Sequence, residues 1–426
     1  EIESEIIFGI FQTWRNLSAI IQNGNTPILQ KKLFMNSLTV LINKFLEKEY
    51  RFIFCLFAVS LFSRVIIAYL YGDRDLENEW MVLVENLYFN NSLSLLKFDD
   101  FFLPNLWMPP IYAYFAYLHA LIFGFNENLA FFIICSQILL SSLTAILFYK
   151  LLNQLFSKEI SCIGSLIFSL FPIIVFSASQ ISSVTIYMFL FIIFILIYFK
   201  LLDNKKLTNI LLFGILSGVL LLTRRDFICI YFFSLFYGLV FFKINYRKIL
   251  LIFFITTITI SPYIVRNYIA FDKIILHSGL GYNVWKAYNP KSKVEGYLFV
   301  DKNLKEQLKK VPKDINYRIN EDKIYLSAAK NYILEDPKKY FGLFLERIFS
   351  FYFYDKNSSQ IYYYNALHLY PNILIGIFSV FGLIIYEKKN KKYNFIVVNM
   401  MIILLVYSLF ALLPRYKVYI LPFQII

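Results

Sequence analysis

The sequence predicts an all-α, polytopic membrane protein, and its composition, its apolar runs and its loop charges each indicate this class. Of the 426 residues, 59% are hydrophobic and 16% are charged, whereas soluble domains have about 25% charged residues. Apolar runs long enough to cross a hydrocarbon core of about 30 Å recur along the chain. Much of the net charge of +14 lies in short loops between these runs, as the positive-inside rule requires. We therefore expect membrane lipids as partners and no nucleic acid.

Residues 1–50 are predicted to form two amphipathic helices on the cytoplasmic membrane surface. The helical patterns cover Ile2–Ile21 and Leu29–Tyr50 and are separated by an Asn-Gly-Asn-Thr-Pro turn, and both are too polar to span a bilayer. A docking element for a partner protein is the alternative. Because the chain begins with Glu1 and its last apolar run ends within a span at Ile426, we expect the sequence to be a fragment.

Residues 51–265 are predicted to form a transmembrane core of about seven spans. The first span, at 52–71, contains Arg64. A charge inside a span costs about 2.5 to 3.5 kcal/mol, so Arg64 should face protein or a wet cavity. A structural ion pair and a role near the substrate remain equal alternatives for this residue.

The segment 73–126 is predicted to be one outer loop. It is rich in acidic residues: Asp73, Asp75, Glu77, Glu79, Glu85, Asp99 and Asp100. The apolar stretch 109–123 opens with two prolines and is short, and the basic loops that follow alternate correctly only if it does not cross the membrane. The later spans are then predicted at 128–149, 160–178, 183–201, 207–223, 226–242, 249–265, 371–386 and 394–413.

The same alternation places several further segments on the outer side. They are the Arg224-Arg225-Asp226 cluster, a domain at 266–370 and the pair Arg415-Tyr416. Residues 371–426 are predicted to form the C-terminal transmembrane helices, which are truncated. The arginine cluster is either an interfacial anchor or an anion site for a lipid phosphate. Residues 301–340 have a charged helical pattern, with Pro337 as a helix-start signal.

Cysteine and histidine patterns indicate no metal site. The four cysteines lie in apolar runs without metal-ligand spacing, and the three histidines are isolated. We expect no bound cofactor. A requirement for a divalent metal and the oligomeric state remain open.

Four segments resemble the polytopic C-type glycosyltransferases, in the branch of protein O-mannosyltransferases, aminoarabinose transferases and the bacterial families 39 and 83. These segments are the acidic loop with residues 78–87 and 107–115, the span end at 221–225, the stretch 262–290 and the stretch 414–422. The most specific is 262–290, which resembles a Pro-Trp-x-x-Arg-Asn span end followed by a Gly/Asn/Trp loop. Tyr263 stands where the family has tryptophan.

The resemblance implies a C-type fold and an inverting hexosyl or pentosyl transfer. The sugar would pass from a polyprenyl-phosphate carrier to a lipid, glycan or protein acceptor of a bacterial cell envelope, at a site on the periplasmic face of the inner membrane. A carboxylate would deprotonate the acceptor, and cations would stabilise the departing phosphate. The implied residues are Glu79 or Glu77 as base, Arg224, Arg225, Arg266 and Arg415 for the lipid phosphate, and Asn267, Tyr282, Asn283, Trp285, Asp73 and Asp75 for the sugar or acceptor.

The family pattern Asp-Glu reads Asn78-Glu79 in this chain. Glu79 aligns with the Glu before the apolar helix, while Glu77, Asp73 and Asp75 remain alternatives for the base. A transporter of lipid-linked glycan, or an O-antigen polymerase or ligase, is the alternative function. A transporter would need polar residues along several spans, and these spans contain few.

Overall fold

The computed structural model describes residues 49–99, 101–355, 358, 365–385 and 390–426. The chain divides into two compact units, Glu1–Val59 and Ser60–Ile426, and the site lies in the second unit. The helices predicted at Ile2–Ile21 and Leu29–Tyr50 lie outside the described residues, apart from Glu49 and Tyr50. Lys388 and Lys389, two of the residues behind the charge alternation, also lie outside the described part of the chain.

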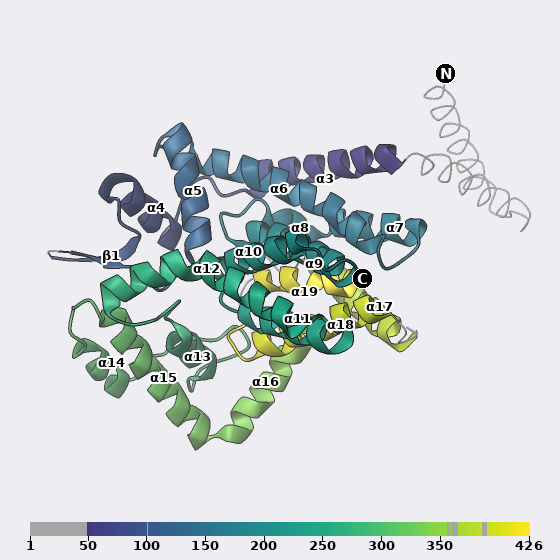
Figure 1. The fold of residues 1–426 in the computed structure, drawn as a ribbon. Helices are drawn as coiled ribbons and strands as arrows, with labels where there is room; N and C mark the ends of the chain where they lie inside the picture. Colours follow the sequence, from purple (N-terminus) through teal and green to yellow (C-terminus); the bar gives the residue numbers. More distant parts are fainter. Residues whose placement is uncertain (1–48, 100, 356–357, 359–364, 386–389) are drawn as a thin grey trace, which may run out of the picture. The chain divides into compact units, whose positions relative to one another are not determined.

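Within the described part of the chain, six helices are long and apolar enough to cross a membrane, so the predicted class is confirmed: the protein is an all-α polytopic membrane protein. They are α3 (Glu49–Tyr71), α6 (Leu129–Leu152), α9 (Val184–Asp203), α12 (Tyr246–Phe271), α17 (Ala366–Ile385) and α18 (Lys391–Ser408). Three apolar helices are shorter: α5 (Pro110–Phe123), α10 (Leu207–Thr223) and α11 (Phe227–Phe241). Figure 1 shows their order along the chain.

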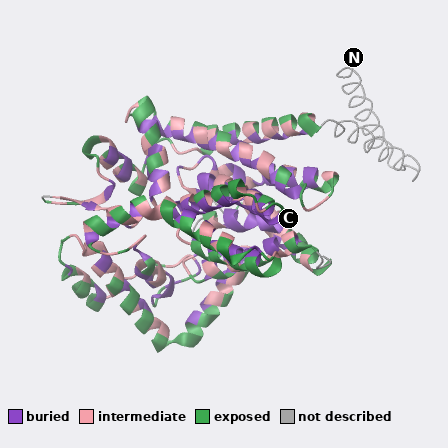
Figure 2. Cartoon of the chain, in the orientation of Figure 1, coloured by how far each residue is buried: buried purple, intermediate pink, exposed green. Residues whose placement is uncertain are grey.

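The central helix of the unit is α9. In its most apolar window 67% of the residues are buried, against 22% for α12, and Figure 2 shows this contrast in colour. Helix α10 packs closely on α12, because a Cβ on Gly218 would stand 2.5 Å from the Cβ of Thr259. Small residues of this kind let membrane helices approach each other. We conclude that α12 presents much of its surface to lipid, whereas α9 is enclosed by protein.

The span predicted at 160–178 is interrupted, which corrects the sequence-based prediction. The structure has α7 (Lys158–Leu170) and α8 (Pro172–Ser177), joined at Phe171, which has extended backbone angles. Proline lacks the N–H that a helix needs and disfavours helical angles in the residue before it, so Pro172 ends α7. Hydropathy averaged across the region does not show this break.

Arg64 compensates for the break in α7. Its guanidinium donates to the Ser169 carbonyl oxygen at 2.9 Å, to the Ser141 Oγ at 2.7 Å and to the Ser60 carbonyl oxygen at 2.9 Å. The Ser169 carbonyl lies in the last turn of α7, where the carbonyl groups have no partner within the helix because the chain leaves it at Phe171. No carboxylate pairs with Arg64 among the described residues, so its contacts are those of a structural residue, without the ion pair considered from the sequence.

The acidic segment is more structured than expected. It contains α4 (Asn78–Asn90) and an antiparallel hairpin of β1 (Ser94–Phe98) and β2 (Phe101–Pro104), which the sequence did not lead us to predict. Helix α5 follows.

Helix α5 lies against the first part of α6. Near its start, the Tyr112 hydroxyl donates to Gln137 Oε1 at 2.9 Å. At its end, Phe123 stacks on Phe132 with ring centroids 3.9 Å apart. Both ends of α5 therefore contact the first part of α6, and Figure 1 shows α5 running across the direction of α6.

Among the described residues, four helices lie between α12 and α17. They are α13 (Leu280–Tyr288), α14 (Lys302–Lys309), α15 (Tyr317–Glu335) and α16 (Pro337–Tyr352), drawn in green in Figure 1. Asp301 and Asp336 cap α14 and α16, accepting from Leu304 N at 2.8 Å and Lys339 N at 3.0 Å, and Pro337 is the first residue of α16, as predicted. Such caps satisfy backbone N–H groups that have no partner within the helix.

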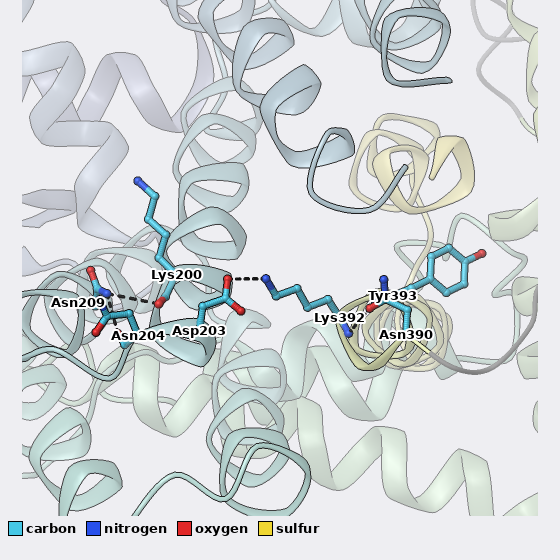
Figure 3. Close-up of polar contacts among 7 residues, drawn as sticks. All are labelled: Lys200, Asp203, Asn204, Asn209, Asn390, Lys392 and Tyr393. Carbon is cyan, nitrogen blue, oxygen red and sulfur yellow. Dashed lines mark hydrogen bonds and ion pairs between the residues drawn. The ribbon is translucent and has the colours of Figure 1, made fainter. Parts of the chain in front are cut away.

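One end of the helices gathers lysines. Lys392 Nζ lies 2.6 Å from Asp203 Oδ2 (Figure 3). Lys205 and Lys391 donate to the carbonyl oxygens of Phe242 and Phe241 at 3.1 and 3.0 Å. The last carbonyl groups of a helix have no partner within the helix and favour cations, so these lysines hold α9, α11 and α18 together. This lysine-rich end agrees with the predicted alternation of spans.

Candidate functional site

A cavity of about 600 Å³ lies at the opposite end of these helices. Helix α9 shows the opposition directly, because Val184 at its start lines the cavity and Lys200 lies in its last turn. The walls come from segments far apart in the sequence: 73–80, 107–109, residues within 173–184, 223–226, residues within 282–286, and residues within 413–419. The fold thus brings the predicted loop, the arginine cluster and the C-terminal motif to one place.

Carboxylates form one wall of the cavity. Asp73, Asp75, Glu77 and Glu79 all line it. Glu79 lies in the first turn of α4, where the partial positive charge of a helix N-terminus favours a carboxylate. Asn78, just before it, has a left-handed backbone with φ of 56°, a conformation that asparagine adopts more readily than most residues. Asn78 thus allows the chain to turn from the extended Glu77 directly into α4.

Asp73 differs from the other acids because its carboxylate is already engaged. Its Oδ2 accepts from Ile181 N at 2.7 Å, and its own N–H donates to the Ser179 carbonyl oxygen at 3.1 Å. Burial raises the pKa of Asp73; the Ile181 hydrogen bond opposes this shift and the charge of Glu77 adds to it. Glu77 and Glu79 are exposed, and no described residue makes a hydrogen bond or ion pair with either side chain. They are therefore the better-placed proton acceptors.

Cations form a second wall. Arg225, Arg415 and Lys286 line the cavity, and Arg415 is exposed. The Arg225 guanidinium donates to the Ser278 carbonyl oxygen. The next residue, Gly279, has φ of 94°, and a Cβ there would stand 3.0 Å from Arg225 Nη1. Glycine is therefore needed for both the backbone angle and the close approach.

Helix α13 turns a polar face to the cavity. Tyr282, Asn283 and Lys286 line it, and the Tyr282 ring lies 4.8 Å from the Trp107 ring. The pKa of Tyr282 is raised, first by burial and then by the negative charge of Glu79. Glu79 and Tyr282 are therefore electrostatic neighbours across the cavity.

Sequence reasoning missed Lys286 and Trp107 as individual site residues. Lys286 stands four residues after Tyr282, on the same face of a helix, which was the signal available for it. Trp107 had a weaker signal, as an aromatic residue between an acidic segment and two prolines.

Three predicted site residues do not line the cavity. Arg266 donates to the Asn105 and Leu93 carbonyl oxygens at 2.9 and 3.1 Å. Asn267 is buried and donates to the Ile275 carbonyl oxygen at 2.7 Å. The Trp285 side chain is 1% exposed and packs on Tyr325 with ring centroids 4.7 Å apart. Arg266 and Asn267 have their donors occupied by backbone carbonyls, and Trp285 is buried, so these side chains have little to offer a ligand. Their contacts instead hold the walls of the cavity in place.

Arg224 also lines the cavity, but its guanidinium is occupied. Its Nε lies 3.0 Å from Asp226 Oδ1, and its Nη1 donates to the Tyr419 hydroxyl at 2.5 Å.

In the described part of the chain, no group of three or more His, Cys, Asp or Glu side chains is arranged to hold a metal ion. The groups that line the cavity are carboxylates, cations, amides and aromatic rings.

A family model described as dolichyl-phosphate-mannose-protein mannosyltransferase matches residues 108–265. The match covers α5 to most of α12 and includes the cavity segments at 173–184 and 223–226. The match covers less than half of the chain, and the family it describes is of the C-type membrane glycosyltransferases. A search of curated proteins gave no significant match. The acidic residues 73–79 and helices α13 to α16 lie outside the matched residues.

Proposed function

We propose that this chain is an inverting glycosyltransferase of a bacterial inner membrane. It moves a hexosyl or pentosyl group from a polyprenyl-phosphate carrier to a cell-envelope acceptor on the periplasmic side. The observation that carries the proposal is the cavity itself, which is lined both by exposed carboxylates and by the cations Arg225, Arg415 and Lys286. The family match to residues 108–265 supports the donor class.

In the proposed reaction, Glu79 acts as the general base. The acceptor hydroxyl oxygen attacks the anomeric carbon on the face opposite the phosphate, and its proton passes to the Glu79 carboxylate. The bond between the anomeric carbon and the phosphate oxygen breaks, and its electron pair stays on the phosphate. Glu77 is the alternative base, since it lines the same wall and is equally exposed.

The departing phosphate is proposed to be stabilised by Arg225, Arg415 and Lys286. Fixed cations aimed at a developing charge lower the barrier without reorganisation at the moment of reaction. Tyr282, Asn283 and Trp107 would orient the sugar or the acceptor, because aromatic faces and amides suit a polar ring. Asp75 lines the same region and is a further candidate contact.

Replacement of the proposed base tests the function. Purified Glu79→Gln and Glu77→Gln proteins are assayed with polyprenyl-phosphate mannose and other polyprenyl-phosphate sugars, in the presence of envelope lipid and glycan extracts. Loss of a general base is expected to lower the rate about 10² to 10⁴-fold. Glu127→Gln is the matched control, because Glu127 is exposed and does not line the cavity.

Full activity in both Glu79→Gln and Glu77→Gln would remove the base assignment. Flipping of lipid-linked sugar in proteoliposomes without any transfer product would favour the transporter instead. Use of a glycan chain on a pyrophosphate, and not of a single sugar on a monophosphate, would favour a polymerase or ligase.

A further inference from the structure

Arg224 is enclosed by four tyrosine rings. Its guanidinium carbon lies 4.3 Å from the ring centre of Tyr419, 5.6 Å from those of Tyr187 and Tyr416, and 5.7 Å from that of Tyr407. The rings come from α9, α18, the 3-10 turn η2 (Pro414–Tyr416) and α19 (Lys417–Ile425). A guanidinium over aromatic faces is attracted by their electron density, more strongly when water is excluded. Arg224 thus joins four elements at the cavity wall.

Asp226 completes the enclosure. One carboxylate oxygen takes the ion pair from Arg224 at 3.0 Å, and the other accepts from the Tyr407 hydroxyl at 2.5 Å. The side chains of Arg224 and Asp226 are 17% and 20% exposed. Burial lowers the pKa of Arg224, but the Asp226 carboxylate and the tyrosines more than offset this, so the net shift is upward. The Arg224 guanidinium therefore keeps its positive charge, and the Asp226 carboxylate balances that charge.

Among the described residues, no carboxylate forms an ion pair with either of the two neighbouring cations, although the charges of Asp226 and Asp322 also act on Arg225. Arg225 has a backbone carbonyl as its hydrogen-bond acceptor, and Arg415 is exposed. A phosphate approaching Arg224 would have to displace Asp226, and breaking a partly buried ion pair leaves one charge uncompensated. A phosphate approaching Arg225 or Arg415 displaces no carboxylate.

The enclosure also fixes the turn that carries Arg415. Tyr416 and Tyr419 pack on Arg224, while Lys417 between them is buried and donates to the carbonyl oxygens of Phe351, at 3.0 Å, and Tyr352. These carbonyls lie in the last turn of α16. Arg415, by contrast, extends into the cavity from a turn that is held on both sides.

We infer that Arg224 and Asp226 are positioning residues, which hold the η2 turn and thereby present Arg415 to the cavity, and that Arg225 and Arg415 bind the phosphate. This inference rests on the proposed function for the identity of the ligand. It reassigns Arg224, which the sequence had suggested as a phosphate ligand, to the support of its neighbours.

Binding of polyprenyl phosphate without a sugar tests the inference separately from transfer. Arg224→Gln and Asp226→Asn are both expected to weaken binding about tenfold, and the double variant is expected to bind no worse than either single variant, because the two residues act as a unit. If Arg224 were itself the ligand, Asp226→Asn would release it and strengthen binding. Effects of opposite sign in the two variants would therefore overturn the inference.

A second comparison asks whether the effect passes through Arg415. In an Arg415→Gln background, Arg224→Gln should add little further loss, whereas a general structural defect would add its full effect. Independent losses in this comparison would also overturn the inference. Arg224→Lys should restore part of the binding, because it retains the charge but loses the planar geometry.

Controls keep the test independent of folding and of the proposed function. Tyr407→Phe removes one hydrogen bond to Asp226 and is used in place of Arg224→Gln if the Arg224→Gln variant does not fold. Normal binding of polyprenyl phosphate by the Tyr407→Phe variant would then count against the inference. Arg247→Gln is the matched control, because Arg247 lies over Tyr246 in the first turn of α12. Wild-type protein that binds polyprenyl phosphate but transfers no sugar contradicts the proposed function alone, and failure to bind it contradicts the inference.

Discussion

Acidic residues close together in the sequence differ in what their surroundings allow them to do. Asp73 is fastened by the Ile181 N–H, whereas Glu77 and Glu79 face the cavity without a partner among the described residues. The sequence identified this group of acids, and its resemblance to the glycosyltransferases placed Glu79 ahead of Asp73, but the residues alone did not show that Asp73 is less available. The ranking depends on a contact with a residue more than a hundred positions away, and no local pattern encodes such a contact.

Asp73 offers a prediction at this scale. Asp73→Asn retains an oxygen that accepts from Ile181 N, so the protein should stay folded. Asp73→Ala leaves that N–H without its acceptor and should cost about 1 to 3 kcal/mol of stability. Melting temperatures of the two variants in the same detergent provide the comparison, and equal melting temperatures would contradict a stabilising role for the hydrogen bond from Ile181 N to Asp73.

The pH dependence of stability is expected to change with the same substitution. The pKa of Asp73 is raised above its usual value of 3.8 in the folded protein, so the folded state binds the proton more tightly than the unfolded state. Its contribution to stability is therefore complete below pH 3.8 and is lost as the pH rises through the folded-state pKa. Asp73→Asn should remove this part of the pH dependence, which melting curves across the acidic range would measure.

At the scale of elements, the break between α7 and α8 is the main departure from the sequence-based prediction. Pro172 was visible in the sequence, but its surroundings are so apolar that 160–178 read as one span. Arg64 was visible too, as an unexplained charge in a span. The structure connects Pro172 with Arg64. The break at Pro172 leaves the Ser169 carbonyl oxygen without a partner in the helix, and the Arg64 guanidinium donates to that oxygen. A prediction made for each segment separately could not join them.

This coupling predicts a compensating pair of substitutions. Arg64→Met should destabilise the protein by about 1 to 3 kcal/mol, because the Ser169 carbonyl oxygen loses its donor inside the protein. Adding Pro172→Ala should restore part of this loss, because Phe171 can then adopt helical angles and the N–H of Ile173 can reach the Ser169 carbonyl oxygen. Melting temperatures of the single and double variants measure the coupling, with Arg247→Met as the control. Additive effects would contradict the explanation.

For the whole molecule, the alternation of basic loops predicted which segments would share one end. The structure agrees for the described loops: lysines gather at one end of α9, α11 and α18, and the acidic and arginine segments gather at the other. The alternation of charges indicates on which side of the membrane a segment lies, but not how far a residue is buried within the protein. It could therefore not separate Arg225, which lines the cavity, from Arg266, whose donors are used by backbone carbonyls.

The sides themselves can be tested by labelling. In a chain with its four native cysteines replaced, Glu127→Cys and Lys206→Cys each add one exposed thiol, beside the start of α6 and just before α10. A membrane-impermeant maleimide applied to intact spheroplasts should label the Glu127→Cys variant, and should label the Lys206→Cys variant only after lysis. The reverse pattern would place the cavity on the cytoplasmic side.

The lengths of α10 and α11 have a consequence for the surrounding bilayer. They have 17 and 15 residues, so at about 1.5 Å per residue they fall about 5 to 8 Å short of a hydrocarbon core about 30 Å thick. A membrane meets such a mismatch by thinning locally. The junction of these helices at Arg224 and Arg225 would then lie in a dimple of the outer leaflet, where a lipid headgroup could enter the cavity sideways while its chain remained among its neighbours.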